Sequence, residues 1–346
     1  MEIVGMTILF SVVTREYILN ASDMRTTIES GGRFLTADES FSKQIFFQYN
    51  EMPFGAMFTG LAHWTDSNNK RINLYDLLAD SIEIEVKRFS AHQVNNITLF
   101  ISSVLKELDE KVSKTRGSFH REKIEIIFSG FESKYGLGIM ICASTYRTKS
   151  PFKVNCDSET FWKTGRFSVY VSGAFNPEVI IAGSGSAHCV SGVEVERLAY
   201  ILSKNPKPYH VAKFICKIVE AVSKRTATVN NKVTFTLIPR IGQFDAFYYG
   251  QEGVDFSCYT PLMIFPGTRW NPAVFPFEIS GLFYGRIEKN NLFAHALLDK
   301  KVKRRVRRKI LRHNSKDIAP YLFDFFSFCF YGQAVSGTKF FNFENE

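Results

Sequence analysis

Short apolar runs separated by polar residues mark the early part of the chain, and this pattern predicts β-strands. Residues 7–13 and 17–21 are apolar and rich in β-branched side chains, and the polar residues 14–16 between them are typical of a hairpin. A second pair of strands is predicted at 44–47 and 55–59. The chain is therefore expected to begin with two strand pairs.

The apolar spacing then changes to three and four residues, which is the period of an amphipathic helix. Leu74, Leu77 and Leu78 follow this period, and a second apolar set runs from Val94 to Leu108. The spacing predicts two amphipathic helices that pack on one face of a sheet.

A second block of strands and helices follows. Ser191 and Glu194 have the spacing of a capping box at the start of a helix over 193–202, and a further helix is expected from Pro208. The order of strands and helix pairs predicts an α+β fold in which sheet packs on sheet and the helices lie outside. The strands expected in this block are 124–128, 137–141, 167–171, 179–182 and 232–239.

The character of the sequence changes after Arg240. Segments rich in aromatic residues, proline and glycine are followed by a strongly basic stretch at 300–312. The net charge is +9, and the basic residues of this stretch account for all of it. We predict a main domain at 1–240 and an aromatic- and basic-rich C-terminal extension at 241–346.

Three interpretations of the basic stretch remain open. In the first, it is a solvated helix face that packs through its apolar stripe. In the second, it neutralises the phosphates of nucleic acid. In the third, it contacts an anionic membrane surface or an acidic partner. No base-reading motif accompanies the charge. The candidate contact residues are Lys301, Lys303, Arg304, Arg305, Arg307 and Arg308.

Cysteine usage and hydropathy narrow the class of protein. The six cysteines include no Cys-x-x-Cys pair and no Cys/His cluster at zinc-ligand spacing, so we expect reduced thiols and no zinc site. Charged residues interrupt every apolar stretch before it is long enough to span a bilayer. The sequence predicts a cytoplasmic protein without a transmembrane segment. His63 is expected to be structural, because no Ser/His/Asp spacing supports a catalytic triad.

Four short segments along the chain carry candidate chemistry. They are residues 21–26 (Ala-Ser-Asp-Met-Arg-Thr), 43–46 (Lys-Gln-Ile-Phe), 59–62 (Thr-Gly-Leu-Ala) and 183–186 (Gly-Ser-Gly-Ser). Together they resemble motifs of the proteasome β-subunit superfamily of N-terminal nucleophile (Ntn) hydrolases, over roughly residues 6–240. The nearest local match is to the bacterial HslV and Anbu branches. The resemblance implies a four-layer αββα sandwich with an extra C-terminal region.

The resemblance also implies the residues of a hydrolytic site. Counting back from Asp23 by the family's separation reaches Thr7, whose hydroxyl would be the nucleophile. Its own α-amine would be the base, because an ordinary α-amine has a pKa of about 8. The remaining residues would be Lys43 with Asp23 to tune that amine, Arg25 to support Asp23, Gly60 to hold the oxyanion, and Ser184 to assist.

The function implied is that of a threonine-type peptidase or amidase acting on a peptide or protein. No metal and no organic cofactor is implied by this hydrolytic chemistry. The peptide would lie as an added strand beside Ala21, Ser22 and the segment around Gly60. A homo-oligomer and an unfoldase or regulatory partner are implied by resemblance only. The alternative is a catalytically inactive proteasome-fold subunit with a structural or binding role, using the basic stretch as its contact surface.

Two departures from the family pattern bear on activity. The stretch between Asp23 and Lys43 is longer than usual, and the segment 225–228 (Arg-Thr-Ala-Thr) lacks the Asp that often follows its Arg. Six residues also precede Thr7. We hypothesise that translation begins at Met6 and that methionine aminopeptidase removes Met6, because Thr7 is small. The alternative is self-cleavage between Met6 and Thr7. The site lacks an α-amine while residues 1–6 stay attached.

Overall fold

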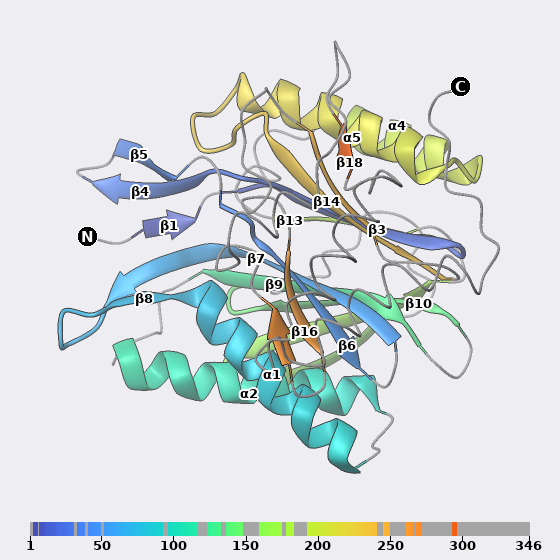
Figure 1. Ribbon diagram of the computed structural model, residues 1–346. Helices are drawn as coiled ribbons and strands as arrows, with labels where there is room; N and C mark the ends of the chain where they lie inside the picture. The colour runs from blue at the N-terminus through green and yellow to red at the C-terminus, as the bar shows by residue number, and fades with distance from the viewer. Residues whose placement is uncertain are drawn as a thin grey trace, which may run out of the picture.

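Two large β-sheets, a separate two-stranded hairpin and four helices make up the described part of this α+β protein (Figure 1). The computed structural model describes residues 3–5, 7–30, 33–38, 41–49, 52–92, 96–116, 123–132, 136–147, 159–174, 178–182, 192–240, 245–249, 261–265, 268–270 and 293–295.

The larger sheet has ten strands and is mostly antiparallel. The parallel pairing of β16 with β6 is an exception to the antiparallel pattern. Along the main path its strands are β11 (Glu159–Thr164), β12 (Phe167–Ala174), β10 (Gly138–Ser144), β9 (Ile124–Phe131), β7 (Met52–Thr65), β6 (Gln44–Tyr49), β16 (Leu262–Phe265) and β17 (Thr268–Trp270). Two short strands, β1 (Ile3–Gly5) and β8 (Arg71–Asn73), also pair with β7.

The second sheet has six strands, all joined by antiparallel pairing. In order they are β13 (Glu178–Ala182), β2 (Leu9–Val13), β3 (Tyr17–Asp23), β14 (Val233–Pro239), β15 (Asp245–Tyr249) and β18 (Phe293–His295). A separate hairpin consists of β4 (Thr26–Ser30) and β5 (Arg33–Asp38).

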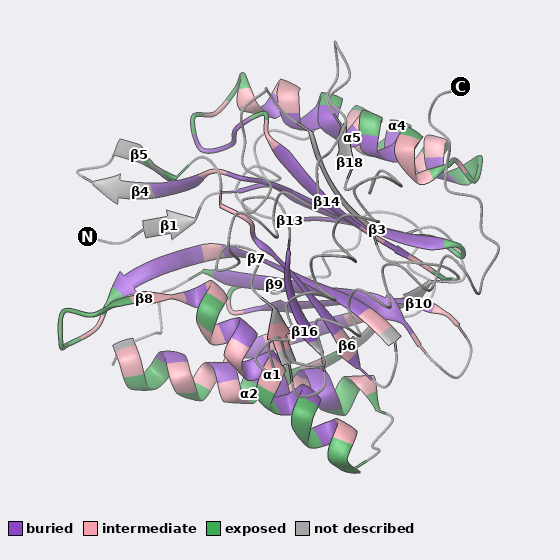
Figure 2. Ribbon diagram, viewed as in Figure 1, coloured by how far each residue is buried: buried purple, intermediate pink, exposed green. Residues whose placement is uncertain are grey.

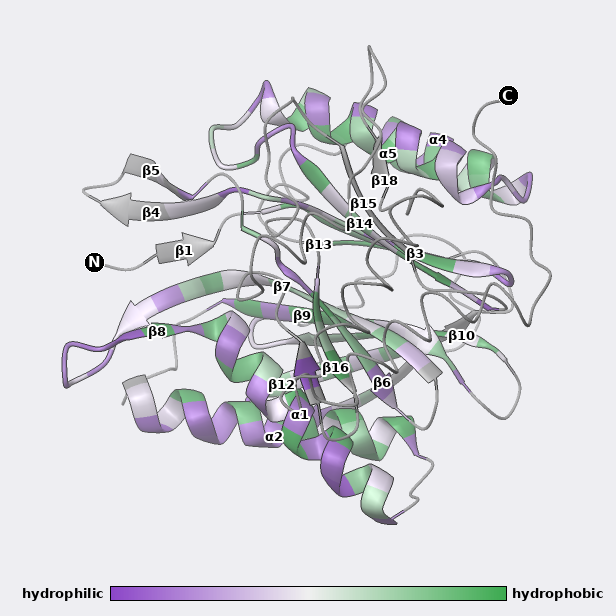
Figure 3. Ribbon diagram, viewed as in Figure 1, coloured by the Kyte–Doolittle hydropathy of each residue, from purple (hydrophilic) through white to green (hydrophobic). Residues whose placement is uncertain are grey.

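A helix pair lies on the outer side of each sheet (Figure 1). Helices α1 (Leu74–His92) and α2 (Ile97–Arg116) cover the ten-stranded sheet, and α4 (Gly192–Ser203) and α5 (Pro208–Ser223) cover the six-stranded sheet. The central strands are buried, whereas the helices expose their outer faces (Figure 2). Each helix carries both polar and apolar residues, as expected for a helix that buries one face against a sheet and exposes the other (Figure 3).

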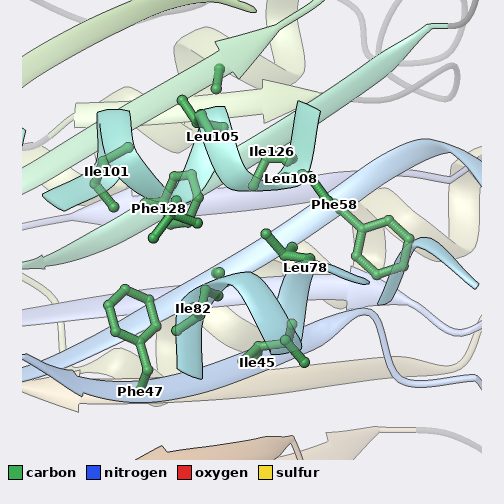
Figure 4. Close-up of a cluster of buried hydrophobic side chains, with 14 of the residues drawn as sticks. Ile45, Phe47, Phe58, Leu78, Ile82, Ile101, Leu105, Leu108, Ile126 and Phe128 are labelled. Atoms are coloured by element: carbon green, nitrogen blue, oxygen red, sulfur yellow. The ribbon is translucent and has the colours of Figure 1, made fainter. Parts of the chain in front are cut away.

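Three apolar clusters hold these elements together. One joins α1 and α2 to the larger sheet, and it includes Phe47, Leu78 and Ile101 (Figure 4). A second joins α4 and α5 to the smaller sheet. A third lies where the two sheets face each other, and it includes Leu9 and Met57. Burial of this apolar surface is the main force that fixes the sheets against each other.

The predicted helix pairs and the predicted strand pairs are confirmed. The two sequence blocks, however, do not correspond to the two sheets. Strands β2 and β3 belong to the smaller sheet, while β6 and β7, from the same early block, belong to the larger one. Ser191 of the expected capping box lies outside the described residues.

Several strands were not predicted from the sequence. The hairpin of β4 and β5 occupies the stretch between Asp23 and Lys43 that is longer than the family pattern. Strands from beyond residue 240 also join both sheets: β15 pairs with β14, and β16 pairs with β6. The division of the chain at residue 240 stays a prediction. Among the described residues, no helix is both long and apolar enough to cross a membrane.

We expect Phe100→Ala to lower the free energy of unfolding by about 3–5 kcal/mol, because it removes a buried ring from the core. Phe100 is fully buried, and its ring centroid lies 4.5 Å from that of Tyr49 and 5.4 Å from that of Phe89. The matched control is Leu99→Ala at the adjacent, half-exposed position, with an expected cost of about 0.5 kcal/mol. Denaturant unfolding measures both, and equal costs would contradict this assignment of the core.

Candidate functional site

Three chain segments bring Thr7, Asp23 and Lys43 together at one end of the sheets. Thr7 lies just before β2, and Asp23 is the last residue of β3. Antiparallel pairing of β2 with β3 places these two ends side by side, and Asp23 N donates to Ile8 O at 3.2 Å. Lys43 lies just before β6 in the other sheet. The cluster therefore forms only when the two sheets pack.

The side chains of these residues are in direct contact. Lys43 Nζ donates to Thr7 Oγ1, and it also contacts Asp23 Oδ1 at 3.0 Å and Arg25 O at 2.6 Å. The Thr7 hydroxyl donates to Asp23 Oδ1. The Asp23 carboxylate also accepts the backbone N–H groups of Ile8 at 3.0 Å and Arg25 at 3.1 Å. A nucleophile candidate, an ammonium and a carboxylate thus share one hydrogen-bonded cluster.

Burial controls the electrostatics of this cluster. Thr7 and Asp23 are 0% exposed, and Lys43 is 2% exposed. Desolvation raises the pKa of Asp23 and lowers the pKa of Lys43, while the attraction between the two charges opposes both shifts. A lysine with a lowered pKa gives up its proton more readily. The cluster thus places a lysine and a carboxylate directly against the Thr7 hydroxyl and fixes its orientation.

Arg25 supports the cluster through its backbone. Its N–H reaches Asp23, and its carbonyl accepts from Lys43. Its guanidinium Nη1 donates to Ala227 O at 2.5 Å, in the loop after α5. From the same loop, Asn230 Oδ1 accepts the Met24 N–H at 3.2 Å. This loop therefore holds the turn between Asp23 and Arg25.

The loop after α5 contains the segment that lacks the expected Asp. The hydroxyl oxygens of Thr226 and Thr228 lie 2.8 Å apart. The loop reaches the site through Asn230 and the Ala227 carbonyl instead. Asn230 was missed at the sequence level, because no motif or periodicity marks it.

Gly60 lies within β7 and has a φ of +103°. This backbone conformation strains residues with a Cβ, and a Cβ here would meet Lys123 O at 1.7 Å. Gly60 pairs with Gly5 of β1, two residues before Thr7. The structure thus brings Gly60 to the segment that carries Thr7. Ser184 and the basic residues of 300–312 lie outside the described residues.

The expected docking of a peptide beside Ala21 and Ser22 is wrong. Strand β3 lies between β2 and β14, so both of its edges are already paired. Beside the segment around Gly60, β1 lies between β4 and β7, because it pairs with β7 at Gly60–His63 and packs on β4. The pairing of strands, and not the type of residue, decides which strand edge a peptide can pair with.

His63 lies near the site with an unusual environment. It is 6% exposed, its ring centroid lies 5.6 Å from that of Phe41, and its Nδ1 has no hydrogen-bond partner among the described residues. Desolvation, with a smaller effect from Arg71, lowers the pKa of His63 to about 4. Its imidazole is therefore neutral at ordinary pH. Among the described residues, no group of His, Cys, Asp or Glu side chains could hold a metal ion.

Solved structures of Anbu proteins are similar to this chain. Anbu (ancestral beta-subunit) from Yersinia bercovieri is 13% identical, with a TM-score of 0.42 over 67% of this chain and 81% of that chain. The Gly-1 mutant of Anbu from Hyphomicrobium sp. strain MC1 is 11% identical, with a TM-score of 0.43 over 69% of this chain and 86% of that chain. Another structure of Anbu from that strain is 10% identical, with a TM-score of 0.40 over 67% and 82%.

No protein-family model matches the sequence, and no curated protein matches it. The likeness to the solved structures is weak at these TM-scores.

We expect the pKa of His63 to make folding stability depend on pH. The unfolded histidine takes up a proton below about pH 6.5, whereas folded His63 resists protonation until about pH 4. The contribution of neutral His63 to the free energy of unfolding is therefore complete above about pH 6.5, and it is lost as the pH falls toward about 4. Between pH 7 and 5 the wild type should lose about 1–2 kcal/mol more than His63→Phe. The free energies of unfolding are measured with denaturant at both pH values. An equal loss between pH 7 and 5 in the two proteins would contradict this assignment.

Proposed function

We propose that this chain is an N-terminal threonine peptidase or amidase of the proteasome-like type, built as an αββα sandwich. The observation that carries the proposal is the contact of Lys43 Nζ with Thr7 Oγ1, with Asp23 behind both. A threonine nucleophile needs its hydroxyl beside a base and beside groups that tune that base, and here the hydroxyl contacts a lysine and a carboxylate.

The reaction begins once Thr7 is the first residue. Its α-amine takes the proton of Oγ1, and the ammonium of Lys43 keeps the pKa of that amine low by charge repulsion. Oγ1 forms a bond to the substrate carbonyl carbon, and the carbonyl oxygen becomes an oxyanion that the Gly60 N–H holds. The C–N bond then breaks, and the amine leaves with the proton from the α-ammonium. Water next hydrolyses the ester on Thr7 and restores the hydroxyl.

Each supporting residue has a defined part in this proposal. Asp23 keeps Lys43 charged and in place, because a buried ammonium needs a nearby carboxylate. The backbone of Arg25 supports both of these side chains. Ser184 is proposed to assist near the nucleophile, by resemblance only.

A peptide substrate fits the position that β1 occupies between β4 and β7. Strand addition at this edge gives backbone hydrogen bonds that do not depend on the substrate's side chains. Residues 3–5 take this position while they are attached to Thr7. Removal of residues 1–6 therefore both frees the α-amine and opens the substrate position. A cytoplasmic homo-oligomer, with an unfoldase or regulatory partner, is proposed by resemblance.

We expect a peptide epoxyketone or β-lactone to add one covalent mass to Thr7 in a chain that begins at Thr7. Thr7→Ala should abolish the adduct, and Thr7→Ser should retain it, because serine keeps a hydroxyl at the same place. Ser11→Ala is the matched control, since Ser11 is a buried hydroxyl that bonds Asn20 at 2.7 Å. Intact-mass and peptide mass spectrometry measure the result. An adduct that survives Thr7→Ala places the nucleophile elsewhere, and no adduct on the wild type favours the inactive subunit.

The state of the N-terminus should decide reactivity. We expect the chain that begins at Thr7 to react at least about 100-fold faster with the same reagent than the chain that retains residues 1–6, because only the former has a free α-amine as base. The two forms can be made from one fusion protein cleaved at different positions, and rates follow from mass spectra over time. Equal rates would show that the α-amine is not the base.

A further inference from the structure

Gln44 follows Lys43 directly and crosses the space between the two sheets. It begins β6 in the larger sheet, and its side chain is 2% exposed. Its Nε2 donates to Thr234 O at 2.7 Å and lies 3.2 Å from Ser22 Oγ, both in the smaller sheet. Its Oε1 accepts the hydroxyl of Thr236. One amide therefore joins β6 to both β3 and β14.

These contacts run beside those of the candidate site. Lys43 reaches Asp23 across the gap between the sheets, and its neighbour Gln44 reaches Ser22, the neighbour of Asp23. The backbone of Gln44 is held as well, because Gln44 O accepts the Tyr75 hydroxyl from α1 at 3.2 Å. Gln44 thus fixes the start of β6 from both of its sides.

We infer that Gln44 is a positioning residue, which sets the distance from Lys43 to Thr7 and Asp23 by tying the two sheets together beside the site. The inference rests on the proposed function of Thr7. An amide with several bonds in a buried place has one favourable geometry, because leaving any buried polar group unpaired is costly. It therefore defines a distance between the sheets more sharply than apolar contacts do.

The structure also offers a matched control at the same interface. Asn20 of β3 bonds Ser11 of β2 at 2.7 Å and Ser129 of β9 at 2.8 Å, so it too links the sheets. Asn20 is buried like Gln44 but adjoins neither Lys43 nor Asp23 in the chain. A purely structural role would give the two residues similar effects, whereas a positioning role would separate them.

The test compares Gln44→Met with Asn20→Leu, which are close in shape and remove the amides. On the chain that begins at Thr7, we expect Gln44→Met to lower the rate of Thr7 labelling by about 10- to 100-fold, because misplacement of a reacting group by about 1 Å has effects of this size. Asn20→Leu should change the rate by less than about threefold at a similar loss of thermal midpoint. Equal rate losses for the two variants would overturn the inference.

A second readout does not depend on activity. The Cε chemical shift of Lys43, followed by NMR against pH, reports its titration. The charged groups that act on Lys43 are Asp23, Arg25 and Asp38, and none is changed by the substitutions. Gln44→Met should move the pKa of Lys43 up toward its ordinary value, because water enters where the sheets separate. Asn20→Leu should leave it unchanged, and an unchanged value in both variants overturns the inference.

The two readouts distinguish failure of the inference from failure of the proposed function. An unlabelled wild type rejects the proposed function, and the Lys43 titration then decides the role of Gln44 alone. If Gln44→Met does not fold, Thr236→Val replaces it. This milder variant removes only the hydrogen bond to Gln44 Oε1, and it should slow labelling and raise the pKa of Lys43 in the same direction. No change in either measurement for Thr236→Val rejects the inference.

Discussion

A buried ion pair between the two sheets, Lys43 with Asp23, is the constraint on which the rest of the site depends. Removing two charges from water costs several kcal/mol per ion, and the cost is offset only where each charge has several partners. Asp23 receives bonds from Ile8 and Arg25 backbone groups as well as from Thr7 and Lys43. Replacing a buried ion pair with well-packed apolar side chains is often neutral or stabilising, so such a pair is weak evidence for a role in stability. The pair is therefore better explained by what it does to Thr7 than by its effect on folding.

The central strand β3 connects this pair to the packing of the whole molecule. Leu19 and Ala21 face the helices that cover the smaller sheet, while Ile18, Asn20 and Ser22 face the larger sheet. Contact between the sheets is thus apolar at the start of β3 and polar toward Asp23. The apolar part holds the sheets together, and the polar part determines how they are aligned where the chemistry is proposed. Loss of alignment need not unfold the protein, which separates stability from activity at this interface.

The sequence predicted the helix pairs, the main strands and the residues that meet in the cluster. Apolar periodicity and the spacing of motifs can both be read from a single sequence. It did not predict which strands share a sheet, since that depends on contacts between distant residues. The docking edge beside Ala21 was wrong for this reason: strand character is visible in the sequence, but a strand's neighbours are not. The contacts of Gln44 and Asn230 were missed because a single polar residue carries no pattern that identifies its partners in distant strands and loops.

The central claim is that the hydroxyl of Thr7 is the reacting atom and that Lys43 lies against it. A crystal structure of the chain that begins at Thr7, bound to a peptide boronate, tests this most directly. We predict a tetrahedral boron bonded to Thr7 Oγ1, Lys43 Nζ within hydrogen-bond distance of that oxygen, and the peptide paired with β7 beside Gly60. Boron bonded to another residue, or Lys43 turned away from Thr7, would contradict the account.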